Sequence, residues 1–130
     1  MEYVVGTPGG AIEPLYNALA RSQRRGSIRP VVARHESGAA FMAEAYGQLT
    51  GRPAACLGTR AVGSANLAIG VHTARQDSTP MFALVGQVQR SFLGREAFQE
   101  VDQVATLGRL AKWAAQPMSA EEIPGIMAEA

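Results

Sequence analysis

The sequence has 130 residues and a mass of 13.7 kDa, which leaves room for one hydrophobic core and excludes a two-domain enzyme. Hydrophobic residues make up 47% and charged residues 18%, so the chain is expected to fold rather than remain disordered. Twelve basic and eleven acidic side chains give a net charge of +1, which excludes the broad positive field typical of nucleic-acid binding.

Four short apolar runs are predicted to be buried strands. In chain order they are residues 3–5, 31–33, 54–57 and 81–85. None of them alternates with polar residues and each ends at or near Gly or Pro, which is typical of parallel strands covered on both faces. A weaker run around Trp113 is expected to add an edge strand.

The stretches between these runs are long enough for crossover helices. The pattern predicts an α/β domain of three layers, in which a central, mainly parallel sheet is flanked by helices. The clearest helix is expected at about residues 36–50, where Gly51 would stop it. A second is expected over residues 64–76, and a third begins near the capping-box pattern Ser119–Glu122.

The helix at residues 36–50 is rich in small residues. Because Gly38, Ala39 and Ala43 let another backbone approach closely, tight packing is expected there, within the chain or between subunits. The pattern alone leaves both placements open.

Residues 1–130 contain no repeat or linker and are interpreted as one domain. The third helix runs to Ala130 and the first strand starts at Tyr3 with no helix before it. The domain is therefore expected to be a fragment, truncated at both ends.

The compartment is predicted from the single cysteine and from the apolar runs. Cys56 has no second thiol to pair with, which favours a reducing compartment and a buried, inert thiol. No run approaches 18 uncharged apolar residues and no signal-peptide pattern begins the chain. A cytoplasmic protein without membrane association is expected.

The glycine-rich segment Gly6–Gly10 lies between the first strand and a helix expected from about Ala11. Glycines allow positive φ and close approach of a ligand to the backbone, and a helix N-terminus offers free N–H groups. A tight strand-to-helix turn explains the same pattern, because neither a G-x-G-x-x-G nor a Walker motif is present.

Glu36 directly follows the second predicted strand. A carboxylate at the carboxyl end of a parallel strand lies where open α/β sheets bind ligands. An ordinary helix-terminal acid is the alternative, because a helix N-terminus stabilises negative charge. His35 is not expected to bind metal, since His72 is the only other histidine and no acidic cluster accompanies either.

Two further segments contain polar groups beside small or aromatic residues. Residues 58–66 are predicted to form a loop after the third strand, and residues 87–102 mix charges with Phe92, Leu93 and Phe98. Such segments often line pockets. A plain turn and a solvated helix face are the respective alternatives.

Five segments occur in collinear order: Gly6-Thr7-Pro8-Gly9-Gly10, Arg34-His35-Glu36, Gly38–Glu44, His72–Pro80 and Gly94–Asp102. Together they resemble the N-terminal, pyrimidine-binding domain of thiamine diphosphate enzymes of the acetolactate synthase and 2-oxoacid decarboxylase superfamily. The resemblance covers about residues 3–115 and implies the thiamine diphosphate-binding fold.

The resemblance implies a function for each matching site residue. In such enzymes the glutamate that corresponds to Glu36 hydrogen-bonds N1′ of the aminopyrimidine and promotes its imino tautomer. That tautomer removes the C2 proton of the thiazolium, and the resulting carbanion attacks a 2-oxo acid. Catalytic roles thus fall to Glu36 and Gln99. The resemblance places Pro8, Gly9 and Gly10 with Glu36 around the cofactor, and Phe98 as an apolar wall.

The chain departs from the family pattern at two places. Ala61-Val62 stands where the family usually has Gly-Pro, and the Gly-Asp-Gly plus downstream Asn signature for Mg²⁺ and diphosphate is missing. The carboxylates are too scattered for a metal site in this chain. Mg²⁺ and diphosphate are therefore expected on another domain or chain, and FAD, which some relatives bind through a middle domain, has no support here.

The resulting hypothesis is half of an acetolactate synthase-like enzyme that uses thiamine diphosphate to decarboxylate or carboligate 2-oxo acids, inactive as the isolated chain. Its expected partners are a 2-oxo acid, a diphosphate-binding domain or subunit, and further copies in a dimer or tetramer. The alternative is a non-catalytic binding or assembly module, favoured by Ala61-Val62 and the missing metal signature and opposed by Glu36 and Gln99. An unrelated nucleotide-binding domain is disfavoured, because no phosphate-loop motif is present.

Overall fold

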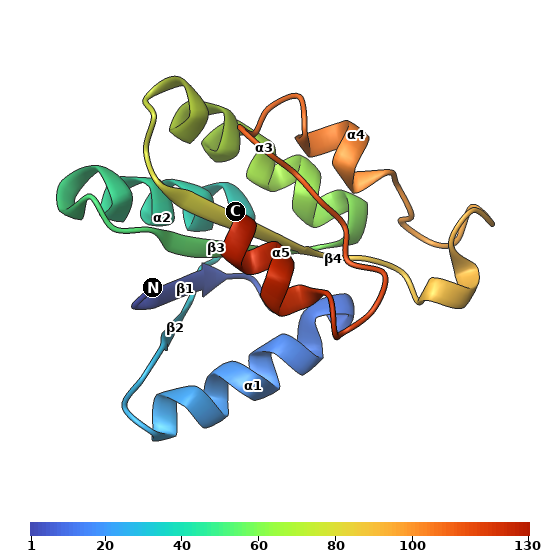
Figure 1. The fold of residues 1–130 in the computed structure, drawn as a ribbon, viewed down its shortest axis with the longest axis horizontal. Coiled ribbons are helices and arrows are strands. Elements are labelled where there is room, and N and C mark those ends of the chain that lie inside the picture. The colour runs from blue at the N-terminus through green and yellow to red at the C-terminus, as the bar shows by residue number, and fades with distance from the viewer.

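The computed structural model describes residues 1–130 and contains a four-stranded, all-parallel sheet with the strand order β2-β1-β3-β4 (Figure 1). The strands are β1 (Tyr3–Gly6), β2 (Arg29–Val32), β3 (Ala54–Thr59) and β4 (Met81–Gly86). The four predicted runs and their parallel pairing are confirmed. Complete burial is wrong for β2 and β4, whose residues are half-buried or exposed because each lies at an edge of the sheet.

The helices are α1 (Glu13–Arg24), entered through a 3₁₀ turn at Gly10–Ile12, α2 (Glu36–Thr50), α3 (Arg60–Gln76), α4 (Gln103–Leu107) and α5 (Ile123–Glu129). The predicted bounds of α2 are confirmed, and Gly51 ends it in the left-handed conformation, with a φ of 66°. The third predicted helix corresponds to α5, which begins just after the capping-box pattern.

Helices cover both faces of the sheet, which confirms the predicted three-layer architecture. In Figure 1, α1 lies on one face and α2 and α3 lie on the other. Side chains of β1 and β3 alternate between two cores, because successive residues of a strand point to opposite faces. Val4 and Leu57 pack with Leu19 of α1, whereas Val5 and Cys56 pack beneath α2 and α3.

The predicted edge strand around Trp113 is wrong. Residues 113–117 have no regular secondary structure, and the Trp113 side chain is 40% exposed. Side chains rather than a strand ladder bind the neighbouring backbone: Arg75 donates to the carbonyl of Arg109, and Arg90 donates to the carbonyl of Met118 at 2.8 Å.

The small residues of α2 pack inside the chain. Ala39, Ala40 and Ala43 are completely buried against the sheet and α3. Gly70 of α3 approaches this face so closely that a Cβ on it would overlap Ala40. A subunit interface through Ala39 and Ala43 is therefore wrong, because their surface is already covered within the chain.

Cys56 is buried in β3, as predicted. Burial raises the pKa of its thiol to about 12, because a thiolate is poorly solvated there. The side chain is therefore a protonated thiol at neutral pH. No helix of the chain has the length and apolar character needed to cross a membrane.

Candidate functional site

The carboxyl ends of β1 and β3 lie side by side and lead to opposite faces of the sheet. The chain passes from β1 to α1 on one face and from β3 to α3 on the other (Figure 1). In open α/β sheets the crevice at such a switch point is the usual place for a ligand. The loops that follow β1, β2 and β3 therefore define the candidate site.

The glycine segment after β1 packs directly on β3. A Cβ at Gly9 would lie 2.6 Å from Cβ of Thr59, so only glycine allows this approach. The Thr59 hydroxyl also accepts a hydrogen bond from the backbone N–H of Ala11 at 3.3 Å. No glycine from Gly6 to Gly10 has a positive φ, so the predicted conformational reason is wrong, and close approach explains Gly6 and Gly9.

This turn leaves open space on its outer side. A Cβ added at Gly10 would meet no atom within 4 Å, and Pro8 is exposed. The segment is thus the tight strand-to-helix turn of the alternative interpretation, and its outer side is open to a ligand. Binding by Pro8, Gly9 and Gly10 stays a prediction.

Glu36 is the first residue of α2 and is only 9% exposed. Asn66 of α3 donates a hydrogen bond from Nδ2 to its Oε2 at 2.9 Å, while Oε1 accepts no hydrogen bond within the chain. The Ser37 hydroxyl donates to the backbone carbonyl of Asn66 at 2.6 Å, which fixes the two helices at this point. The carboxylate also lies at a helix N-terminus, where negative charge is stabilised.

His35 caps the same helix. Its Nδ1 accepts a hydrogen bond from the backbone N–H of Ser37 at 3.2 Å. Nowhere in the chain do three His, Cys, Asp or Glu side chains lie close enough together to hold a metal ion. The hydrogen bond to Ser37 gives His35 a capping role at the start of α2.

Phe98 and Gln99 are attached to the start of α3. The backbone N–H of Ala61 donates to the carbonyl of Gln99 at 3.1 Å, and Arg60 Nη1 donates to the carbonyl of Phe98 at 3.4 Å. Arg60 and Gln99 both have left-handed backbones, with φ values of 50° and 61°. Such conformations cost about 1 to 3 kcal/mol each and cluster at functional sites.

The structure brings Gln99 to the β3 side of the crevice but forms no contact between it and Glu36. The Phe98 ring is 75% exposed, so this chain alone does not enclose an apolar wall. The roles of Gln99 and Phe98 stay predictions.

Residues 58–66 do not form the predicted loop. The left-handed backbone of Arg60 turns the chain within one residue, so β3 passes directly into α3 and Asn66 lies inside the helix. This is why α3 starts at Arg60, four residues before its predicted start. The departure at Ala61-Val62 therefore lies in the first turn of a regular helix.

Several buried polar atoms without a hydrogen-bond partner lie at the carboxyl ends of the strands. The five buried side-chain atoms without a hydrogen-bond partner are Thr7 Oγ1, Tyr16 OH, Arg60 Nε and both amide atoms of Gln103. Three of them lie beside the ends of β1 and β3. Since buried polar atoms are nearly always paired in folded proteins, these exceptions mark this end of the sheet as a candidate place for a polar partner that the chain does not itself supply.

Tyr16 and Asn66 had no assigned role in the sequence. Tyr16 lies in an amphipathic helix, where an aromatic residue is indistinguishable from an ordinary core residue. Asn66 lay in a segment predicted to be a loop, so its contact with Glu36 was not foreseen. Only the spacing from strand end to polar residue could have drawn attention to Asn66.

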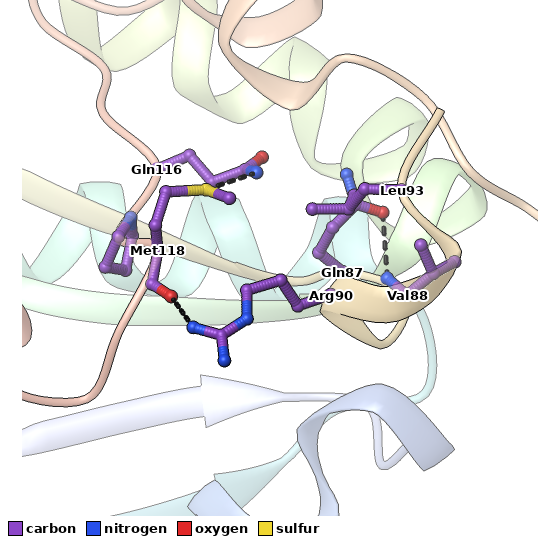
Figure 2. A pocket seen from close by; sticks show the side chains of 7 residues that line it. Gln87, Val88, Arg90, Leu93, Gln116 and Met118 are labelled. Carbon is purple, nitrogen blue, oxygen red and sulfur yellow. Dashed lines mark hydrogen bonds between the residues drawn. The ribbon is translucent and has the colours of Figure 1, made fainter. Parts of the chain in front are cut away.

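Two small hollows lie beside the end of β4, away from Glu36. Figure 2 shows one of them, with Arg90 reaching the backbone of Met118 across it. Gln87, Leu93 and Gln116 line both hollows. Residues 87–102 contain only a 3₁₀ turn, so the alternative of a solvated helix face is wrong, and their predicted role in lining a functional site stays a prediction.

Comparison with known families gives a direct match. Residues 1–106 match the model of the thiamine pyrophosphate enzyme, N-terminal TPP binding domain. The chain belongs to this thiamine pyrophosphate enzyme family. The resemblance inferred from the five collinear segments is thereby confirmed.

Similar members of the thiamine pyrophosphate enzyme family are acetolactate synthases. The chain is 38% identical to the isozyme 1 large subunit of Escherichia coli (strain K12) over 130 residues, which are 100% of this chain and 23% of that protein. It is 42% identical to the isozyme 2 large subunit of the same organism over 127 residues, 98% of this chain and 22% of the relative. It is 43% identical to the acetolactate synthase large subunit of Pyropia yezoensis over 102 residues, which are 78% of this chain and 17% of that protein. The chain thus spans about a fifth of the length of these relatives.

Proposed function

We propose that this chain is the pyrimidine-binding part of an acetolactate synthase-like enzyme that decarboxylates or carboligates 2-oxo acids with thiamine diphosphate. The observation that carries the proposal is the Glu36 carboxylate, buried at the crevice, with Oε2 bonded to Asn66 and Oε1 unpaired. The names of the similar acetolactate synthases support the reaction class.

The residues at this edge fit the aminopyrimidine half of the cofactor. That half presents several ring and amino nitrogens, and the chain offers the Glu36 carboxylate together with the unpaired hydroxyls of Thr7 and Tyr16. Open space at Gly10 gives access from the outer side. When bound, thiamine diphosphate supplies the electron sink that 2-oxo acid chemistry needs.

The side chains around the crevice have separate tasks in this proposal. Glu36 exchanges a proton with the pyrimidine ring through Oε1, as a positioned acid–base group does. Asn66 holds Oε2, so the carboxylate cannot rotate away from the crevice. The backbone contacts of Arg60 and Ala61 hold Phe98 and Gln99 at the start of α3, where Gln99 would line the pocket and Phe98 would form its apolar wall.

Mg²⁺ and the diphosphate belong to another domain or chain in this proposal. The chain brings no three ligand-type side chains together, and its relatives are about five times longer. Nothing in the chain supports FAD. Cys56 is the chain's single cysteine and is free, which suits a reducing compartment, so we place the enzyme in the cytoplasm.

The isolated chain is expected to bind thiamine diphosphate with a dissociation constant weaker than about 100 μM, because pyrimidine contacts alone must offset the cost of association. Titration calorimetry with Mg²⁺ present measures this value, and the Glu36→Gln chain provides the background heat. Submicromolar binding by the chain alone would contradict the assignment of half a cofactor site.

The outer surface of the α2–α3 layer is the proposed contact with a second copy of the enzyme. Its exposed apolar side chains are Phe41, Met42, Leu49, Val62 and Ile69, between 40% and 86% exposed. Large apolar side chains left exposed on the helices of one layer are typical of an interaction surface. Relatives about five times longer leave ample chain to cover this surface in an oligomer.

Met42→Asp is expected to weaken assembly of the enzyme that contains this chain, since a carboxylate would be buried without a partner in the contact. Light scattering measures the mass of the assembly, and Ala20→Asp on the exposed side of α1 is the matched control. The folding stability of the isolated chain should change little, because Met42 is already 49% exposed. Unchanged mass in the Met42 variant would argue against this interface.

A further inference from the structure

The hydroxyl of Tyr16 is buried over the end of β1 and has no hydrogen-bond partner. It lies 2.8 Å from the position that a Cβ on Gly6 would take, so the phenol fills the space left by the missing side chain. Burying an unpaired hydroxyl is unfavourable, and phenylalanine would fill the same space without that cost. The hydroxyl therefore has a reason to be present other than packing.

Gly6 connects this hydroxyl to the segment that carries Glu36. The Gly6 carbonyl accepts a hydrogen bond at 2.9 Å from the backbone N–H of Ala33, three residues before Glu36. Tyr16 packs beside Gly6 on the α1 face of the sheet, whereas Glu36 is bonded to Asn66 in the α2–α3 layer on the other face. The end of β1 and the segment that follows β2 thus connect the two side chains.

The charge of Glu36 reaches Tyr16. Burial raises the pKa of the phenol, and the negative charge of Glu36 raises it further, because a phenolate beside a carboxylate is disfavoured. No other charged group contributes to this shift. Tyr16 therefore keeps its proton at neutral pH and remains a hydrogen-bond donor.

We propose that Tyr16 is a positioning residue of this site, whose hydroxyl supplies a donor on the α1 side of β1 that acts together with the Glu36 carboxylate on the α2 side. The inference rests on the proposed function of Glu36. Its ligand is the aminopyrimidine class already assigned to the crevice, approached from both faces of the sheet edge.

Titration of Tyr16 in the chain itself tests the coupling without any cofactor. Tyrosine labelled with ¹³C at Cζ gives three resonances, and the one lost in Tyr16→Phe belongs to Tyr16. In Glu36→Gln the pKa of Tyr16 is expected to fall, because the neighbouring negative charge that helps to raise it has been removed. Glu44→Gln, which removes another buried carboxylate from α2, should leave it unchanged. An unchanged Tyr16 pKa in Glu36→Gln would overturn the coupling.

The kinetics of the enzyme that contains this chain test the positioning role. In Tyr16→Phe the KM for thiamine diphosphate is expected to rise about 3- to 10-fold with kcat little changed, because the bound pyrimidine loses one hydrogen-bond donor. Tyr46→Phe is the control, since Tyr46 bonds Glu2 away from the site. An unchanged KM in Tyr16→Phe would overturn the proposal. Failure of the proposed function is distinct, because it would appear as full activity in Glu36→Gln.

Discussion

Replacement of Glu36 by glutamine is expected to lower turnover of the enzyme that contains this chain by about 10²- to 10⁴-fold, or roughly 3 to 5 kcal/mol of barrier. Glutamine keeps the shape of the side chain and can still accept the hydrogen bond from Asn66. It cannot exchange a proton with the pyrimidine ring. Proton exchange at C2 of the bound cofactor, followed by NMR in deuterated buffer, separates this step from substrate chemistry.

Glu44→Gln is the matched control for this experiment. Glu44 is also buried on α2, but it accepts a hydrogen bond from Thr79, which lies just before β4. This contact is therefore at the amino ends of the strands, whereas the crevice is at their carboxyl ends. Turnover and C2 exchange should therefore stay close to those of the unmodified enzyme. If the Glu36 variant exchanged C2 at the original rate with cofactor bound, the assigned role would be wrong.

Gly70→Ala is expected to lower the free energy of unfolding by about 2 kcal/mol, through overpacking between α3 and α2. The new Cβ would overlap Cβ of Ala40 and lie 3.1 Å and 3.3 Å from its backbone C and Cα. Backbone on both helices limits relief of this contact, which outweighs the gain in helix propensity. Urea denaturation of the isolated chain measures the change, provided that the slope with urea is unaltered.

Gly38→Ala in α2 provides the opposite expectation. A Cβ at Gly38 would meet no atom within 4 Å, so the substitution should stabilise the chain by up to about 0.5 to 1 kcal/mol through reduced entropy of the unfolded state. Equal destabilisation by both substitutions would mean that helix geometry, and not the contact with Ala40, determines the effect.

The sequence was sufficient to predict the elements whose signals are local. The apolar runs identified all four strands, and three- and four-residue spacing before Gly51 predicted α2. Exposure of β2 and β4 was not predictable, because it depends on which strands end up at the edges. The run around Trp113 was predicted to be a strand but forms none, since apolar composition does not specify a pairing partner.

The candidate site was predictable in part for the same reason. Glu36 follows a strand directly, so the topology of parallel sheets was enough to place it at the ligand-binding edge. The structural importance of Tyr16 and Arg60 depends on long-range contacts and on a left-handed backbone that no local pattern indicates. The left-handed turn at Arg60 also explains why a predicted loop became the start of α3.

The two edges of the sheet differ in their capacity to recruit another strand. The N–H groups of Arg29 and Ala33 donate toward β1, so Pro30 faces outward and removes a donor from the open side of β2. The six residues of β4 include no proline or charged residue to protect their open side. Main-chain pairing between molecules is therefore favoured at one edge only. Two molecules joined through β4 would form a closed pair rather than a growing fibre, because neither would offer a second edge strand that pairs readily.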